Sequence, residues 1–353
     1  MKESTKNIIK YLLAAIITFL AIYVIIKDID FPKLWEIILN VDYLYIIATV
    51  PIIIFSHLIR AVRWKTLLSP VHKAKSLFNL FSGVMVGYAV NAFTPRGGEL
   101  VRPFVYARRE KISLTSTFAT IIVERVLDLL TLLIIFAAAF FWFREEIAAA
   151  FPYLTTERIF LFFIGPIIAI LAIILLVIYT NIGYYLLKKI VKPISEKFYD
   201  RLNQLMTKFI RGFDFIRTPS QYFRVIIESF IMWFFYALPL YVTFFAFDFQ
   251  AQLNLTMGDA FLLLIVVGVG VTIAPTPGSI GVYHYLVTVA MTNLYVISKE
   301  DALAFATVAH AVNYIVQISV GAAFLLRENI RKIPAHDEIA DRIDESKIGE
   351  SLK

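Results

Sequence analysis

Ionisable side chains gather in one short stretch of an otherwise apolar chain, residues 91–104, which read NAFTPRGGELVRPF. Arg96, Glu99 and Arg102 follow one another at intervals of three residues, so a helix would make them neighbours on one face. Two guanidinium groups beside one carboxylate leave a net positive charge, which suits a phosphate or carboxylate ligand. Pro95 and the glycines that follow predict a bend with unpaired backbone N–H groups, which also favour an anion. The stretch predicts an anion site where two helices meet at a break.

A second group of charges lies within residues 120–134, which read TIIVERVLDLLTLLI. Glu124 and Asp128 are one helical turn apart on a shared face, and Arg125 lies between them in sequence. Ionisable groups inside a membrane segment need partners, and the expected partners are Arg96 and Arg102. Such pairs would be structural, or they would exchange for a lipid phosphate. Paired carboxylates can also serve acid–base chemistry, but no nucleophile or metal ligand set stands beside them, so we assign no catalytic residue and no metal ligand.

A third polar group lies near the C-terminal end of the chain. Residues 272–285, TIAPTPGSIGVYHY, place His284 between two tyrosines, of which Tyr283 is the candidate site residue. His310, Asn313 and Gln317 then form one polar stripe on an apolar helix. The stripe is typical of a substrate contact or, equally, of hydrogen bonds between packed helices. Two histidines without acidic neighbours in sequence do not predict a metal site.

The composition defines the class of protein. Hydrophobic residues make up 59% of the 353 residues and charged residues 17%, with no cysteine, whereas soluble domains are about half apolar and a quarter charged. The chain is therefore expected to be an integral membrane protein without disulfides or thiol chemistry. Its net charge of +7 is interpreted as basic loops facing an anionic cytoplasmic leaflet rather than as a nucleic-acid site. The chain carries no Walker phosphate-binding motif, so no ATP and no other cofactor is expected.

Apolar segments with the length of a membrane-spanning helix recur along the chain. Two more apolar regions, 77–94 and 260–296, are interrupted by proline and glycine. The six predicted full spans are residues 8–26, 43–59, 117–143, 159–179, 225–247 and 303–326.

Loop charges give the orientation, since Lys and Arg stay in the cytoplasm. The basic N-terminus and residues 60–75, which carry five Lys or Arg and no acid, are placed inside, and the net acidic residues 28–42 outside. Residues 96–111 are again basic, so 77–94 is predicted to enter from the cytoplasm, turn near Pro95 and return as a re-entrant hairpin. Its alternative is a surface hairpin with solvated charges. Residues 260–296 are predicted to form a second such hairpin from the outside; two short crossings stay open, which would make eight spans.

The predicted fold is an all-α polytopic transmembrane bundle with two re-entrant hairpins in an inverted repeat. Residues 1–326 form a single domain with half-repeats at about 8–143 and 159–326. The span at 159–179 leads into an amphipathic cytoplasmic segment, residues 183–217, with a break near Pro193. Residues 327–353 form a charged cytoplasmic tail. Both termini are thus cytoplasmic, in the inner or plasma membrane.

These motifs resemble the lysylphosphatidylglycerol synthase transmembrane family, which has a flippase-like domain and includes integral membrane proteins of the UPF0104 type. The resemblance covers about residues 8–326. Ser279 stands where a second glycine is common in that family, and His284 where a glutamate often follows, which leaves the role of His284 open. The residues that carry the resemblance are Asn91, Pro95, Arg96, Gly98, Glu99, Arg102, Glu124, Asp128, Pro277, Gly278 and Gly281.

The resemblance implies a lipid translocase without a soluble synthase part. A phosphate-bearing head group would cross a polar cavity between the hairpins, held by Arg96 and Arg102. Glu99, Glu124 and Asp128 would orient those arginines, and His284 with its tyrosines would line the outer gate. The candidate substrate-binding residues are Asn91, Arg96, Gly98, Glu99, Arg102, Glu124, Arg125, Asp128, Pro277, Gly278, Gly281, Tyr283, His284, His310 and Asn313.

Two other functions stay open from the sequence. A membrane-embedded transferase acting on a polyprenyl-linked or phospholipid substrate would need a catalytic carboxylate such as Glu99 or Asp128. An accessory subunit would show no activity alone but would co-purify with a partner. Homo-oligomerisation, a partner enzyme that supplies the lipid, the lipid itself and the direction of transport are left undecided.

Overall fold

The described part of the protein is built from helices. A computed structural model describes residues 3–70, 72–145, 180–196, 198–200 and 219–328, together with scattered positions between 165 and 207. Over these residues the chain forms helices and no strand, which confirms the all-α prediction. The described residues leave out most of the predicted span 159–179, the tail after Glu328, and residues 197, 201, 204, 205 and 208–217 of the predicted segment 183–217.

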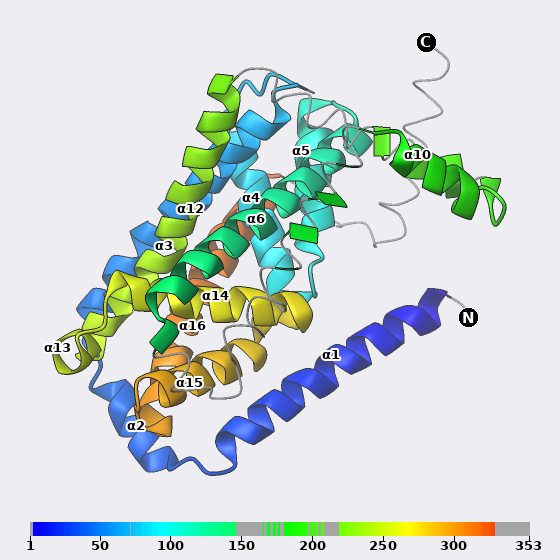
Figure 1. Cartoon of the computed structure of the whole chain (residues 1–353). Coiled ribbons are helices and arrows are strands. Elements are labelled where there is room, and N and C mark those ends of the chain that lie inside the picture. The colour runs from blue at the N-terminus through cyan, green and yellow to red at the C-terminus, as the bar shows by residue number, and fades with distance from the viewer. Residues whose placement is uncertain are drawn as a thin grey trace.

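Six helices lie in the described part of the first half (Figure 1). They are α1 (Glu3–Ile26), α2 (Phe31–Leu39), α3 (Tyr43–Leu68), α4 (Leu77–Phe93), α5 (Gly98–Glu110) and α6 (Leu114–Trp142).

Among the described elements of the second half, two short helical turns end just before Pro193, and the longer helices come later in the chain. In chain order they are α10 (Ile182–Leu186), the π-helical turn η2 (Leu187–Val191), α12 (Pro219–Ala246), α13 (Phe249–Leu253), α14 (Met257–Ile273), the 3₁₀ turn η3 (Pro277–Ser279), α15 (Val282–Leu294) and α16 (Lys299–Arg327).

Capping residues in the sequence fix where the helices of the bundle begin. Asp42 caps α3, and Ser76, Ser113 and Ser298 cap α4, α6 and α16, each accepting a hydrogen bond from a backbone N–H in the first turn. The helix α4 ends at Phe93 because Thr94, which precedes Pro95, is held in an extended conformation.

Three described helices are long and apolar enough to cross a membrane: α3, α12 from Ser220 onward, and α16. A fourth candidate span is α1 with α2, a pair bent by 93°. The helix α3 differs from its prediction, because it continues nine residues beyond 59, to Leu68. Its last turns contain Arg60 and Arg63, which the sequence suggested were in a cytoplasmic loop, and both are buried.

The two halves contain helices of matching length. The helices α4 and α14 have 17 residues each, and the helices α5 and α15 that follow them have 13 residues each. The long helices that follow, α6 and α16, have 29 residues each. In Figure 1 the α4–α5 pair lies toward the top of the bundle and the α14–α15 pair toward the bottom.

The bundle is held together by contacts between the halves. The helices α3 and α12 run side by side, and α16 packs along α4 (Figure 1). Among the described elements α1 lies apart from the bundle, and its main contact is with α15. The close approach of α16 to α4 depends on Gly321, where a Cβ would lie 2.5 Å from the Met85 carbonyl oxygen.

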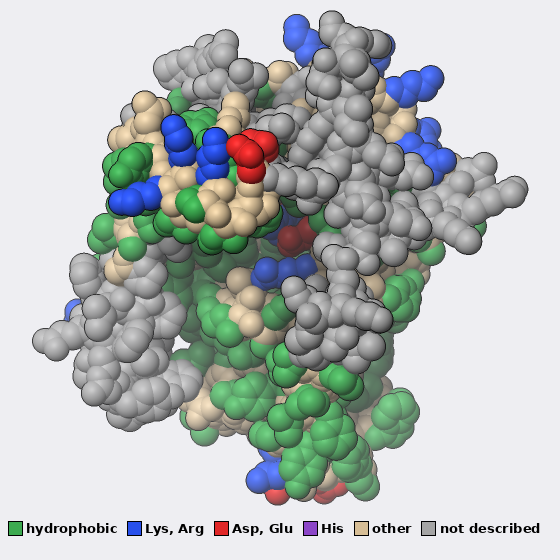
Figure 2. All heavy atoms as spheres, turned by 90° about the vertical axis from the view of Figure 1, so that its right-hand side faces the viewer, with side chains coloured by type: hydrophobic (Ala, Val, Ile, Leu, Met, Phe, Trp, Pro, Cys, Tyr) green, Lys and Arg blue, Asp and Glu red, His purple; other side chains and the backbone are tan. Residues whose placement is uncertain are grey.

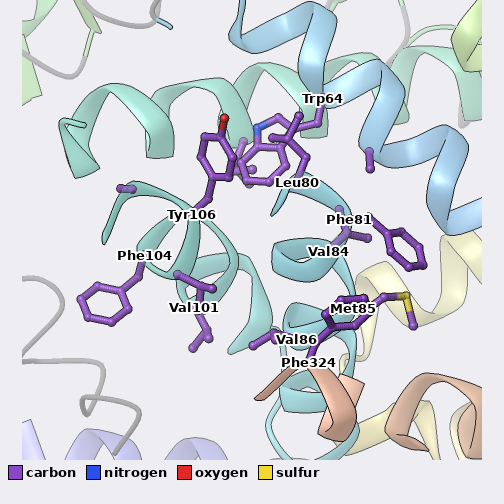
Figure 3. Close-up of a cluster of buried hydrophobic side chains, with 14 of the residues drawn as sticks. Trp64, Leu80, Phe81, Val84, Met85, Val86, Val101, Phe104, Tyr106 and Phe324 are labelled. Carbon is purple, nitrogen blue, oxygen red and sulfur yellow. The ribbon is translucent and has the colours of Figure 1, made fainter. Parts of the chain in front are cut away.

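Trp64 belongs to a cluster of buried apolar side chains from α3, α4, α5, α6 and α16 (Figure 3). Trp64 and Tyr106 are fully buried, with ring centroids 5.1 Å apart. The indole N–H of Trp64 donates to Thr120 Oγ1 over 3.0 Å, which satisfies its one polar atom. This core fixes the α4–α5 pair against α3 and α6, and so it positions the charged residues next to it.

Candidate functional site

Glu124 is the centre of a buried group of ion pairs. Its side chain is fully buried in α6, and its Oε1 accepts from Arg60 Nε and from Arg102 Nη1, both over 2.8 Å. Arg125 Nη2 lies 2.9 Å from the same oxygen. The predicted pairing of Glu124 with Arg102 is therefore present in the structure. A carboxylate at this depth would be strongly destabilising without such partners.

Two arginines of α3 belong to this group, although the charge pattern predicted that both lie in a loop. Arg63 is fully buried; it forms an ion pair with Asp128 and donates to Ser229 Oγ over 3.2 Å. Arg60 Nη2 lies 3.3 Å from Asp128 Oδ2. The overlooked signal is the spacing: the two arginines are one helical turn apart, in a pattern of buried apolar residues that continues through Trp64 and Leu68.

Arg125 lies between the buried carboxylates and the more exposed Glu99. Its Nη2 lies 2.9 Å from Asp128 Oδ2, and its Nη1 lies 3.8 Å from Glu99 Oε1. The Glu99 side chain is 32% exposed, so it is the carboxylate of the group that is most accessible. We call the whole set the arginine–carboxylate cluster: Arg60, Arg63, Arg102, Arg125, Glu99, Glu124 and Asp128.

The cluster is short of negative charge. Four arginines meet three carboxylates, which leaves one net positive charge at neutral pH. Within the described residues, Arg102 Nε and Nη2 are buried without a hydrogen-bond partner. Buried donors are nearly always satisfied in proteins, so unpaired ones in a cavity wall are suited to a ligand or to water. The arrangement is chemically able to accept an anion.

Aromatic side chains contact two arginines of the cluster, Arg60 and Arg102. Arg102 stacks on Trp64, with Cζ 4.0 Å from the ring centroid. Arg60 Nη1 donates to the hydroxyl of Tyr88 and, over 3.3 Å, to that of Tyr236. Since the two tyrosine hydroxyls are also 3.1 Å apart, α3, α4 and α12 are joined through one guanidinium group.

Close backbone contact brings the two arms of the first hairpin together. A Cβ at Gly98 would lie 1.9 Å from the carbonyl oxygen of Gly87, so only glycine fits there. The Gly98 N–H donates to Asn91 Oδ1 over 2.8 Å, which explains the asparagine of the motif. Together these contacts place Glu99 and Arg102, in the first turns of α5, against α4.

Arg96 is not in the predicted row with Glu99 and Arg102. It has a φ of 57°, precedes the first residue of α5, and is exposed. Its Nη2 donates to the carbonyl of Thr272 in α14, over 3.1 Å. The left-handed backbone at the turn rotates this side chain away from Glu124 and toward the second hairpin. The prediction that Arg96 pairs with Glu124 or Asp128 was therefore wrong.

The second hairpin carries a group of rings at its tip. His310 Nε2 lies 2.8 Å from the Gly278 carbonyl oxygen, and its ring centroid is 4.8 Å from that of Tyr283 and 4.9 Å from that of His284. Gly278 has a φ of 57° and lies against Tyr314 and the Ala92 carbonyl. The tips of the two hairpins are thus in contact.

Three adjoining cavities lie between these groups. The largest, about 360 Å³, is lined from the first half by Asn91, Arg96, Glu99 and Arg125 and from the second half by residues such as His310. A cavity of about 110 Å³ beside it reaches Arg60 and Arg102. A third, of about 220 Å³, lies on the other side of Tyr88, which lines all three. Figure 2 shows charged side chains at the base of a hollow on one face of the molecule.

Most of the predicted site residues meet around these cavities. Glu124 and Asp128 lie behind them in the arginine–carboxylate cluster, and His284 contacts His310. Pro277 forms the turn at the second tip, whereas Gly281 faces α1, where a Cβ would lie 2.8 Å from the Thr18 carbonyl oxygen. The predicted residues that line the two cavities beside the cluster are Asn91, Arg96, Gly98, Glu99, Arg102, Arg125, Gly278, Tyr283, His310 and Asn313.

The apolar helical bundle and its buried charges define an integral membrane protein. The chain belongs to the family described as the lysylphosphatidylglycerol synthase TM region, which it matches over residues 7–321. This confirms the resemblance seen in the motifs.

Named relatives include two membrane proteins and one glycosyltransferase. The chain is 25% identical to a UPF0104 membrane protein of Methanocaldococcus jannaschii over 92% of this chain and 98% of that protein. It is 25% identical to a UPF0104 membrane protein of Methanothermobacter thermautotrophicus, over 68% of this chain and 72% of the relative. It is 23% identical to the glycosyltransferase AglD of Haloferax volcanii over 92% of this chain but only 55% of that protein. No solved structure matches the chain.

Proposed function

We propose that the protein is a lipid translocase that carries a phosphate-bearing lipid head group through the cavities between its two helix hairpins. The observation that carries this proposal is the positive arginine–carboxylate cluster with unpaired donors of Arg102 beside a cavity. A phosphate can accept those hydrogen bonds and balance the charge, and Arg is the side chain best shaped for it.

The helix lengths support hairpins that dip into the membrane. At 1.5 Å per residue, the 17-residue arms α4 and α14 extend about 25 Å and the 13-residue arms α5 and α15 about 20 Å, short of a hydrocarbon core of about 30 Å. The α4–α5 hairpin would enter from the cytoplasm and the α14–α15 hairpin from the outside. The basic N-terminus and the C-terminal tail would both be cytoplasmic, in the plasma membrane.

An inverted repeat would provide two alternating states. The matched lengths of α4, α5 and α6 against α14, α15 and α16 support it. So do the crossed contacts, because each hairpin packs on the last helix of the other half, α4 on α16 and α14 on α6. In transporters built this way the substrate binds where the repeats meet, and rocking of one half against the other opens the site to each side.

The roles of individual residues follow from their positions. Arg102 and Arg60 would hold the phosphate in the small cavity, with Arg125 at its edge. Glu124 and Asp128 would orient these arginines rather than meet the lipid, because both are occupied by ion pairs. Arg96 would act at the contact between the hairpin tips, where its bond to Thr272 must break when they separate.

Lipid movement in vesicles tests the proposal. Purified protein is reconstituted with phosphatidic acid carrying a fluorescent acyl chain, and dithionite added outside bleaches the label that reaches the outer leaflet. We expect bleaching beyond the outer-leaflet fraction with the wild type and its loss with Arg102→Gln. The surface variant Lys111→Gln serves as the control and should behave as the wild type. Equal bleaching with Arg102→Gln and wild type would contradict the proposed site.

A second candidate function is a membrane-embedded transferase. One observation favours it: Glu99 is partly exposed, reaches two cavities, and has its cluster arginine at 3.8 Å, so this carboxylate is available to act as a base. The relative AglD is named a glycosyltransferase. Purified protein would be incubated with a polyprenyl-phosphate sugar and the lipids examined by mass spectrometry. A product that disappears with Glu99→Gln would support the transferase.

A further inference from the structure

His57 is buried in the wall of the 220 Å³ cavity without a hydrogen-bond partner. His57 belongs to α3 and is 2% exposed. Within the described residues neither of its ring nitrogens makes a hydrogen bond. Its ring lies on that of Tyr88, with centroids 4.2 Å apart. A neutral imidazole offers one donor and one acceptor, so a group in the cavity could satisfy both.

The cavity wall offers further neutral hydrogen-bonding groups. Asn313 and Gln317 of α16 line the cavity, and Gln317 Nε2 donates to Asn313 Oδ1 over 3.1 Å. That bond leaves the amide N–H groups of Asn313 and the carbonyl of Gln317 able to reach a ligand. The wall also contains the hydroxyls of Ser56 and Thr243, but these donate to their own helices, over 2.7 Å each. The polar part of the wall is therefore an imidazole and two amides, with tyrosines around them.

No carboxylate, lysine or arginine is among the residues that line this cavity in the described part of the chain. Two of its lining tyrosines are bound to a positive group, since Arg60 donates to the hydroxyls of Tyr88 and Tyr236. A cationic head group would therefore meet aromatic rings that already hold a guanidinium, with a positive cluster behind them. An anionic group has its partners on the other side of Tyr88. The lining suits an uncharged, hydroxylated group.

Tyr88 connects this cavity to the phosphate site. Its side chain lines both the cavity of Arg102 and the cavity of His57, so a phosphate held by the arginines would lie next to the second cavity. The 220 Å³ of that space far exceeds the roughly 10–15 Å³ that one water needs, so it has room for an organic group.

We propose that the cavity around His57 is a head-group subsite that takes an uncharged polyol, glycerol or a sugar, attached to the lipid phosphate. His57, Asn313 and Gln317 are its hydrogen-bonding residues. This inference rests on the proposed translocation, and it adds what the head group beyond the phosphate must be. It predicts that lipids with a hydroxylated head group move faster than phosphatidic acid and than lipids with a cationic head group.

The test compares lipids that differ only in the head group. Vesicles carry phosphatidylglycerol, phosphatidylinositol, phosphatidic acid or phosphatidylethanolamine, each with the same fluorescent acyl chain, and translocation is measured by dithionite bleaching. The variant His57→Phe keeps a ring against Tyr88 but removes both nitrogens. We expect it to slow phosphatidylglycerol and phosphatidylinositol about tenfold, the effect of about 1.4 kcal/mol, and to leave phosphatidic acid unchanged.

Two further variants separate recognition from folding. Asn313→Leu should reproduce the selective loss. Thr49→Val, on the same helix, removes a hydroxyl that donates to the Ile46 carbonyl and should have no effect on selectivity. An equal loss for all lipids with His57→Phe, or no loss for any, would overturn the subsite while leaving translocation standing. Faster movement of phosphatidylethanolamine than of phosphatidylglycerol would also overturn it. Absence of movement for every lipid with wild-type protein would instead refute the translocase.

Discussion

Arg60 and Glu124 are 64 residues apart and belong to different helices, yet Arg60 Nε donates to Glu124 Oε1 over 2.8 Å. The pair joins α3 to α6 in the middle of the bundle. Glu124 Oε1 also receives Arg102 and Arg125, so one carboxylate oxygen connects three helices. Stability and the candidate site therefore depend on the same atom.

Replacing Glu124 should destabilise the protein more than replacing any exposed acidic residue does. Glu124→Gln leaves the buried arginines with one counter-charge fewer, and breaking a buried ion pair typically costs 3–5 kcal/mol, on the order of the whole stability margin of a domain. We expect a lower melting temperature in detergent and less folded protein by size-exclusion chromatography. Glu145→Gln is the control, because the Arg144–Glu145 pair is exposed and such pairs contribute about 0–1 kcal/mol. Equal melting temperatures for the two variants would refute the central role of Glu124.

Arg102 should not tolerate lysine. Its planar guanidinium stacks on Trp64, donates to Glu124 and keeps further N–H groups beside a cavity that the residue lines, and an ammonium cannot do all three. Arg102→Lys keeps the charge, so we expect folded protein that translocates phosphatidic acid at least about tenfold more slowly, a loss of about 1.4 kcal/mol. Transport by Arg102→Lys at the wild-type rate would show that charge alone is sufficient.

The contact between Gly98 and Gly87 should be intolerant of even one methyl group. In Gly98→Ala the new Cβ would lie 1.9 Å from the Gly87 carbonyl oxygen, so α5 must move away from α4. Overpacking of this kind costs about 1–3 kcal/mol or more, and the melting temperature should fall accordingly. The matched variant is Gly268→Ala, whose Cβ would meet the Leu132 side chain at 3.4 and 3.5 Å, an ordinary contact. A stable Gly98→Ala protein with full transport would contradict the packed hairpin.

Single cysteines can test the two hairpins directly, because the natural chain has no cysteine. Lys73 and Lys111 are exposed and flank the α4–α5 hairpin; Asn254 and Val296 are exposed and flank the α14–α15 hairpin. If both hairpins are re-entrant, Lys73→Cys and Lys111→Cys react with an impermeant maleimide from one side of the membrane. Asn254→Cys and Val296→Cys then react from the other side. Labelling of the two members of a pair from opposite sides would mean that the two helices together cross the membrane only once.

The sequence was informative wherever local pattern decides structure. The breaks at Pro95 and at Pro277–Gly278 predicted the ends of α4 and α14, because proline and glycine act on the backbone itself. The spacing of Glu124 and Asp128 placed both carboxylates on one helix face, and the composition required partners for them. Arg102 was predicted as one of those partners, and it is.

Other parts of the site could not be predicted from local pattern. Arg60 and Arg63 looked like the basic end of a span, because isolated charges normally end a membrane helix. They lie inside the bundle since Glu124 and Asp128 of another helix neutralise them, and α3 continues to Leu68 as a result. For Arg96 the prediction was wrong in the opposite way: a buried ion pair was expected, but the positive φ of Arg96 itself turns its side chain toward α14.

The sequence by itself determined the class of protein, the helix breaks and the residues whose charge must be compensated. Each of these follows from hydrophobicity, backbone restriction or charge, properties that a residue carries wherever it is placed. Only the tertiary structure decided which charges meet, how Tyr88 comes to line three cavities, and why His57 is buried without a partner among the described residues. These depend on how distant helices pack, and packing is set by the shapes of many side chains together rather than by any one segment.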